Sequence, residues 1–140
     1  MSLSLQKTPT EAFFQLKEDP SSLLIDVRSN LELSNDGIVN LLEIKRDIIF
    51  KEWLTYASVE TSENFFEDIL KESEEKTVAN LFFICRSGIR SREAAEYCQF
   101  KFQEIERKVI CINISEGLDG NNNPNYSFGW KNAGLPWKNI

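Results

Sequence analysis

The stretch FFICRSGIRSREAA, residues 82–95, decides how the rest of the sequence is interpreted. It begins as an apolar run that ends on Cys85, and it continues as a polar loop that contains Arg86, Gly88 and Arg90. After the loop, apolar residues recur at helical spacing. The stretch therefore predicts a buried strand, a tight loop and a helix, with a thiol at the carboxyl end of the strand.

Other apolar runs along the chain alternate with helical patterns. Short runs without polar alternation are typical of strands that are covered on both faces. The expected strands are residues 23–27, 77–85 and 108–114, and helices are expected after Thr8, over 63–71 and over 91–103.

The first expected helix has clear end signals. Thr8 is the expected N-cap, Pro9 takes the first helical position, and Glu11 completes a capping box. The pair Asp19-Pro20 ends this helix.

Several polar segments are expected to lie outside the regular elements. Residues 30–40 and the charged run KESEEK at 71–76 are predicted to be loops. Residues 41–44 and 47–53 form either two short strands or one strand with irregular flanks. The Gly- and Asn-rich residues 117–128 are expected to form a long loop.

This order of elements predicts an α/β fold with a mainly parallel central sheet and helices on both faces. In such folds, ligands bind beyond the carboxyl ends of the strands, where Cys85 lies. The length of 140 residues suits one hydrophobic core, and no linker or repeat is visible. We therefore expect a single domain over residues 1–140.

The composition excludes several classes of function. A formal net charge of −6 argues against a broad surface for nucleic acid or for anionic membranes. No apolar run is long enough for a signal peptide or a membrane span, so we expect a cytoplasmic location and no membrane partner.

The sequence contains no histidine and no CxxC pair, which argues against a zinc site. We expect no metal and no cofactor. The three cysteines, Cys85, Cys98 and Cys111, are expected to be free thiols. Cys98 lies on the apolar face of a helix and Cys111 lies in an apolar strand, so both are predicted to be buried, whereas Cys85 is predicted to be exposed.

The residues after Cys85 suit a bound anion. Backbone N–H groups of a tight loop can converge on one point, and Gly88 provides the backbone freedom that this requires. A helix that begins near Ser91 directs its positive end to the same place. These features favour a thiolate without a histidine base, and Arg86 and Arg90 add donors for an anionic substrate.

The length of the loop separates two chemistries. Phosphatases that form a phosphocysteine place their arginine six positions after the cysteine, and here Ser91 occupies that position. The arginine comes one position earlier, at Arg90. The loop is therefore expected to be too short for a phosphoryl group and large enough for one sulfur atom. This length argues against a third class of function, a phosphatase or arsenate reductase.

These motifs resemble those of the single-domain rhodaneses, which are thiosulfate sulfurtransferase-like proteins. The sequence CRSGIRS (85–91) resembles their active-site loop, LLIDVRSNLEL (23–33) is similar to their first motif, and GWKNAGLPW (129–137) resembles their C-terminal motif. The chain departs from the pattern at residues 36–39, which lack the usual His and Pro, and in the longer loop at 117–128.

The resemblance implies a rhodanese-like fold and a double-displacement reaction. Cys85 would take a sulfane sulfur from a small anionic donor such as thiosulfate and pass it to cyanide or a thiol. Arg86 and Arg90 would hold the sulfonate of the donor, and Asp26 and Arg28 would brace the strand ends. The substrate-binding residues implied are Arg86, Ser87, Gly88, Ile89, Arg90 and Ser91.

A second interpretation is a sulfur carrier or non-catalytic binding module of the same fold, which accepts sulfur from, or delivers it to, a protein partner. Turnover with thiosulfate and cyanide, compared with turnover with a protein persulfide donor, separates the two. The tryptophans Trp53, Trp130 and Trp137 are expected to pack in the core or at its rim.

Overall fold

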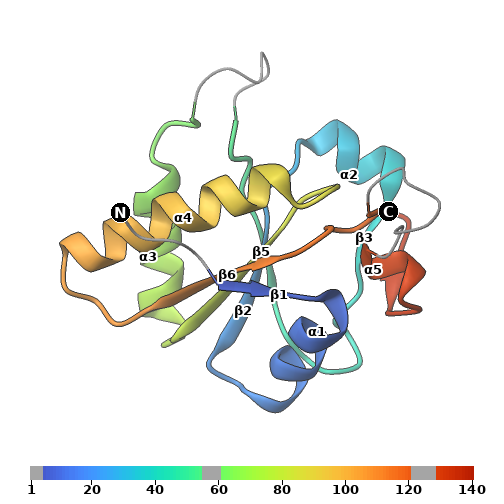
Figure 1. The fold of residues 1–140 in the computed structure, drawn as a ribbon, viewed down its shortest axis with the longest axis horizontal. Coiled ribbons are helices and arrows are strands. Elements are labelled where there is room, and N and C mark those ends of the chain that lie inside the picture. Colours follow the sequence, from blue (N-terminus) through green and yellow to red (C-terminus); the bar gives the residue numbers. More distant parts are fainter. Residues whose placement is uncertain (1–4, 55–60, 121–128) are drawn as a thin grey trace.

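The computed structural model describes residues 5–54, 61–120 and 129–140, and its centre is a five-stranded sheet (Figure 1). All neighbouring strands of this sheet are parallel, which confirms the predicted α/β class. Two further short strands, β3 (Ile38–Val39) and β7 (Trp137–Lys138), form a separate antiparallel pair. In spatial order the central strands are β1 (Leu5–Lys7), β6 (Ile110–Ile114), β5 (Asn80–Ile84), β2 (Ser22–Asp26) and β4 (Ile48–Phe50).

Helices cover both faces of the central sheet (Figure 1). On one face lie α3 (Phe65–Glu75) and α4 (Ile89–Glu104), and on the other lie α1 (Pro9–Glu18) and the short α5 (Gly129–Asn132). The helix α2 (Asn30–Asp36) follows β2 directly.

The central strand β5 shows why its sequence has no polar alternation. Leu81 and Phe83 pack in the cluster that includes residues of α3 and α4, whereas Phe82 and Ile84 pack in the cluster that includes residues of α1. All four side chains are buried, because each face of the strand is covered. The strand is thus buried on both faces up to the residue before Cys85.

The helix α1 begins and ends as predicted. The backbone N–H of Glu11 donates to Oγ1 of Thr8 at 3.2 Å, and the backbone N–H of Thr8 donates to Oε1 of Glu11 at 2.9 Å. These two bonds form the expected capping box, and Asp19 is the C-cap.

The prediction of a loop over residues 30–40 is wrong. These residues form α2 and β3, and α2 starts with a second capping box. The backbone N–H of Glu32 donates to Oγ of Ser29 at 3.3 Å, and the backbone N–H of Ser29 donates to Oε1 of Glu32 at 3.2 Å. Five of the seven residues of α2 are polar, and this composition is compatible with the helix because only Leu33 is buried.

The prediction of a loop over 71–76 is also wrong, since α3 continues to Glu75. Ion pairs one helical turn apart, Lys71–Glu75 and Glu72–Lys76, lie along this solvated end of the helix. Two further elements differ from the prediction. The helix α4 begins at Ile89 instead of near Ser91, and the strand β1 was not predicted. Residues 41–44 form no strand, so β4 with irregular flanks is the alternative that applies.

Two of the three tryptophans pack in the core, as predicted, and the third lies at the surface. Trp130 and Trp53 are buried, whereas Trp137 is 40% exposed, with Nζ of Lys131 at 4.2 Å from the centre of its ring. In the part of the chain that the structure describes, no helix is long and apolar enough to cross a membrane. Of the predicted loop at 117–128, residues 121–128 lie outside the described residues.

Candidate active site

Cys85 directly follows the last residue of β5 and is the first residue of a loop over residues 85–91, called here the Cys85 loop. Its sulfur Sγ accepts the backbone N–H of Gly88 at 3.1 Å and that of Ser91 at 3.3 Å. Gly88, with φ of 99°, is the N-cap of α4. The positive end of this 16-residue helix and two N–H donors therefore meet at the sulfur.

Cys85 is only 1% exposed, so the prediction of an exposed thiol is wrong. The loop folds back over the end of the strand, and Cys85 belongs to the core cluster on the side of α3 and α4. Cys98 and Cys111 are equally buried, as predicted, and burial raises the pKa of both thiols. Cys85 therefore differs from them by its N–H donors and not by its exposure.

Ser91 links Cys85 to a polar side chain within β6. Its Oγ lies 3.2 Å from Sγ of Cys85 and 2.6 Å from Oδ1 of Asn113. The side-chain amide of Asn113 donates to the carbonyl oxygen of Gly88 at 3.1 Å and to Oε1 of Gln6 at 2.8 Å. Because a carbonyl oxygen only accepts hydrogen bonds, this contact fixes which atom of Asn113 faces Ser91.

Asn113 was not predicted as part of the site. Its side chain is buried beside the Cys85 loop, and it orients both the hydroxyl of Ser91 and the backbone at Gly88. One signal was available, since Asn113 is a polar residue inside the apolar run KVICINI at 108–114. A buried polar group needs hydrogen-bond partners, so its position in a core strand indicates a structured polar contact.

The segment after β6 packs against the Cys85 loop and forms hydrogen bonds with its backbone. The backbone N–H of Leu118 donates to the carbonyl oxygen of Cys85, and that of Asp119 donates to the carbonyl oxygen of Arg86, both at 2.9 Å. A Cβ atom at Gly117 would lie 2.4 Å from the carbonyl oxygen of Cys85. Close backbone packing thus requires glycine at position 117.

Arg90 forms a bidentate ion pair with Glu32 at the start of α2. Nη1 and Nη2 of Arg90 donate to Oε1 and Oε2 of Glu32, each at 2.7 Å. These hydrogen bonds from Arg90 lower the pKa of Glu32 from 4.5 to about 2. The role of Arg90 in holding a substrate stays a prediction, and Glu32 already accepts one N–H from each terminal nitrogen of Arg90.

The remaining predicted loop residues face outward. Arg86 is exposed and its Nε lies 3.5 Å from Oδ2 of Asp119. The side chains of Ser87 and Ile89 are exposed as well. Of the predicted binding residues, Gly88 and Ser91 contact the sulfur of Cys85 directly, and they do so mainly through the backbone.

Asp26 and Arg28 form a buried ion pair at the carboxyl end of β2. Nη2 of Arg28 lies 2.7 Å from Oδ2 of Asp26, and it also donates to the carbonyl oxygen of Gly37 at 2.9 Å. The backbone N–H of Val27 donates to the carbonyl oxygen of Ile84, at the end of β5. The pair thus connects the end of β2 to the end of α2 and makes no described contact with the sulfur.

A cavity of about 340 Å³ lies beside the Arg90–Glu32 pair. Leu31 is strongly exposed at its wall, and Glu52 faces it from the segment after β4. Across the described ranges 5–54, 61–120 and 129–140, no cluster of side chains could hold a metal ion. The residues that line the cavity are Ser29, Asn30, Leu31, Glu32, Glu52, Leu54 and Arg90.

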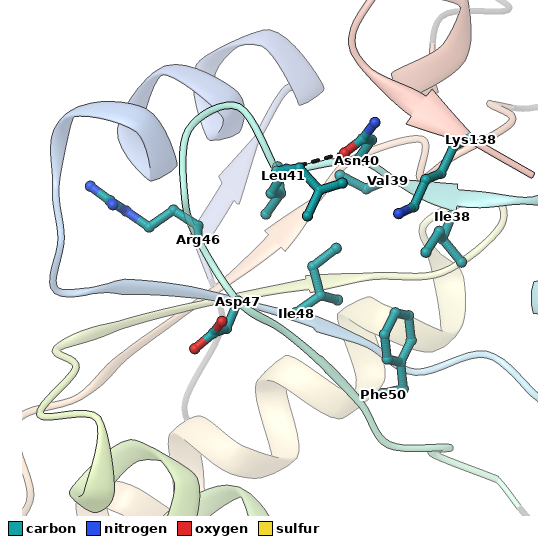
Figure 2. Close-up of a pocket in the computed structure, with 10 residues that line it drawn as sticks. Ile38, Val39, Asn40, Leu41, Arg46, Asp47, Ile48, Phe50 and Lys138 are labelled. Carbon is teal, nitrogen blue, oxygen red and sulfur yellow. Dashed lines mark hydrogen bonds between the residues drawn. The ribbon is translucent and has the colours of Figure 1, made fainter. Parts of the chain in front are cut away.

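A second hollow, of about 200 Å³, lies between β3 and β4 (Figure 2). Its wall is largely apolar and carries Lys138 of β7 and Arg46 and Asp47 of the segment before β4. The Cys85 loop contributes no residue to it, so this hollow is separate from the candidate active site.

Comparison with known proteins places the chain among uncharacterized relatives. No protein-family model matches it. It is 35% identical over 129 residues to the uncharacterized protein RC0915 of Rickettsia conorii, covering 92% of this chain and 93% of that protein. The uncharacterized protein RP600 of Rickettsia prowazekii is 36% identical over the same shares of the two chains.

Solved structures share the fold over most of the chain. The crystal structure of Rv0390 from M. tuberculosis has a TM-score of 0.77 and 28% identity, and the match covers 99% of this chain and 100% of that one. The polysulfide-sulfur transferase homodimer of Wolinella succinogenes has a TM-score of 0.58 and 21% identity, over 98% and 80% of the two chains. The As-Sb reductase of Leishmania major has a TM-score of 0.60 and 16% identity, over 81% and 72%. The chain therefore has a rhodanese-like fold and belongs to the same protein family as the uncharacterized Rickettsia proteins.

Proposed function

We propose that this protein is a rhodanese-type sulfurtransferase that carries a sulfane sulfur on Cys85 as a persulfide. The observation that supports this most directly is the position of Sγ, which accepts the N–H groups of Gly88 and Ser91 at the start of α4. Backbone donors and a helix N-terminus stabilise negative charge on sulfur, both on a thiolate and on a persulfide. The Cys98 and Cys111 thiols are buried and their pKa is raised, which makes them poor nucleophiles.

The reaction has two displacement steps. In the first, the Cys85 thiolate attacks the outer sulfur of a donor such as thiosulfate; a new S–S bond forms, and the donor's S–S bond breaks and releases sulfite with the electron pair. In the second, cyanide or a thiolate attacks the outer sulfur of the persulfide and leaves as thiocyanate or a new persulfide. The Cys85 thiolate is regenerated, and no external oxidant or reductant is needed.

Intact mass spectrometry tests this proposal. Incubation with thiosulfate or with inorganic polysulfide should add one sulfur atom to the protein, and cyanide should remove it. The Cys98→Ala and Cys111→Ala variants should still form the adduct, and Cys85→Ser should not. An unchanged mass of the wild-type protein with every donor, or an adduct on Cys85→Ser, would contradict the proposal.

A sulfur carrier that exchanges sulfur with a protein partner is the second candidate. Leu31 and Ile89 support it, because they are 70% and 60% exposed on α2 and on the Cys85 loop, next to Glu32 and Arg90. Exposed apolar side chains at a site suit contact with another protein. A carrier should form the persulfide but turn over slowly with cyanide, and a protein thiol acceptor should then discharge it faster than cyanide does.

A further inference from the structure

Glu32 accepts one N–H from each terminal nitrogen of Arg90, the arginine that the family resemblance implicates in donor binding. We propose that Glu32 determines donor specificity: it disfavours donors that carry a sulfonate, such as thiosulfate, and favours polysulfides and persulfides, which have none. This inference rests on the proposed sulfurtransferase function.

The geometry of the ion pair supports this role. The two terminal nitrogens of Arg90 each donate to a different oxygen of Glu32 at 2.7 Å. This end-on arrangement is the one in which an arginine would also bind two oxygens of a sulfonate. The carboxylate of Glu32 therefore competes with a donor's sulfonate for Arg90, and it also neutralises the charge of Arg90.

Glu32 is held firmly in this position. Its Oε1 also accepts the backbone N–H and the hydroxyl of Ser29, each at 3.2 Å, so the carboxylate is part of the N-terminal cap of α2. A sulfonate that displaced Glu32 from Arg90 would leave a half-buried carboxylate without its cation. The capping box of α2 thus holds the carboxylate of Glu32 next to Arg90 before a donor binds.

Arg86 does not replace Arg90 as a strong sulfonate site. Its side chain is 57% exposed, and its Nε lies 3.5 Å from the carboxylate of Asp119. An exposed guanidinium group contributes little to the binding of an anion, because water screens the interaction. A sulfonate at the Cys85 loop would therefore meet Arg90, which is paired with Glu32, and Arg86, which is exposed to solvent.

Donors without a sulfonate have no pair of oxygens for a bidentate contact with an arginine. The thiolate of Cys85 attacks a terminal sulfur of a polysulfide; a new S–S bond forms, the adjacent S–S bond breaks, and a polysulfide shorter by one sulfur leaves with the electron pair. The N–H groups that donate to Sγ of Cys85 belong to the backbone of Gly88 and Ser91, and the Arg90–Glu32 pair does not engage them.

The test compares kcat/KM for thiosulfate and for inorganic polysulfide in the Glu32→Gln variant. Glutamine also fits the third position of a capping box, so the variant should fold, and urea unfolding checks this. Thiosulfate efficiency should rise by about 10-fold or more, mainly through a lower KM, while polysulfide efficiency should change by less than about 3-fold. If Glu32→Gln does not fold, Glu32→Asp is used, and it should shift thiosulfate efficiency in the same direction by a smaller factor.

Two further variants identify the cause. Glu93→Gln removes an exposed carboxylate from the first turns of α4 and should leave the ratio of the two efficiencies as in the wild type. The double variant Glu32→Gln/Arg90→Ala should lose the gain with thiosulfate, because the gain needs the released guanidinium group.

The outcomes separate this role from the proposed function. If the wild type uses thiosulfate as efficiently as polysulfide, or if Glu32→Gln gains nothing with thiosulfate, Glu32 does not set specificity although sulfur transfer stands. If neither donor forms an adduct on Cys85, the proposed function fails and the role of Glu32 fails with it.

Discussion

The hydroxyl of Ser91 donates its proton to Oδ1 of Asn113 across 2.6 Å while its oxygen lies 3.2 Å from the sulfur of Cys85. A hydroxyl has one proton, so in this arrangement it presents a lone pair to the sulfur. When Cys85 carries negative charge, the hydroxyl can donate to the sulfur only by turning away from Asn113. Ser91 and Asn113 therefore form one coupled unit.

This coupling predicts a non-additive effect on stability. Ser91→Ala leaves Oδ1 of Asn113 buried without its donor and should lower the free energy of unfolding by about 1–3 kcal/mol. The double variant Ser91→Ala/Asn113→Ala should lose about 0.5–3 kcal/mol less than the sum of the two single variants. Urea unfolding of the four proteins measures the difference, and additive losses would show that the two side chains act independently.

The close approach at Gly117 predicts a large effect of a single methyl group. Gly117 and Gly134 both have positive φ, 60° and 74°, so alanine is strained at either position by about 1–2 kcal/mol. At Gly134 nothing lies within 4 Å of an added Cβ, whereas at Gly117 the backbone of Cys85 and Arg86 blocks it. Gly117→Ala should therefore reduce the free energy of unfolding clearly more than Gly134→Ala, and equal losses would contradict the packing argument.

The ion pair between Glu32 and Arg90 predicts that the stability of the folded protein decreases in acid. The pKa of Glu32 falls from 4.5 in the unfolded chain to about 2 in the fold, so the folded state favours the charged form. This contribution to stability is complete above about pH 4.5 and disappears as the pH falls to about 2. The difference in unfolding free energy between wild type and Glu32→Gln should shrink over this range, and a constant difference would count against the ion pair.

The buried thiols predict selective labelling. Burial raises the pKa of Cys98 and Cys111, so iodoacetamide should leave both unmodified in the folded protein at neutral pH. Unfolding in urea should expose both to the reagent. Peptide mass mapping locates the label, and rapid labelling of Cys98 or Cys111 in the native state would be incompatible with the packing of α4 and β6.

The buried pair Asp26–Arg28 predicts a strong dependence on both charges. Asp26→Asn leaves the guanidinium group of Arg28 in the core without its anion and should cost about 3–5 kcal/mol of unfolding free energy. The surface pair Lys51–Asp68, with side chains 27% and 52% exposed, is the matched control. Asp68→Asn should cost about 0–1 kcal/mol, and similar losses in both variants would argue against a structural role for Asp26.

Much of the fold was predictable because its signals are local. The apolar run before Cys85, the loop with Gly88 and the helix that follows are contiguous, and the capping box at Thr8 spans four residues. The capping box at Ser29 was equally local but lies in a polar segment, and a polar helix lacks the apolar stripe that marks an amphipathic one. The strand β1 has three residues and pairs on one side only, which leaves little pattern to detect.

The missing parts of the site depend on contacts between distant residues. Glu32 and Arg90 are 58 positions apart, and Ser91 and Asn113 are 22 apart. Neither the pairing of a particular carboxylate with a particular arginine nor the burial of Cys85 follows from local patterns. Both result from the order in which the strands are arranged in the sheet, which brings the end of β2 and the end of β5 together.

We expect the completion of the Cys85 loop to be a late event in folding, because it depends on the hydrogen bond from Asn113 to Gln6. This bond joins residues 107 positions apart, and the strands that carry them, β1 and β6, are parallel neighbours. Contacts of such large sequence separation carry a high entropic cost of loop closure and tend to slow folding. We therefore expect β5 and α4 to assemble first around Cys85, and the amide of Asn113 to become fully oriented only when β1 joins the sheet.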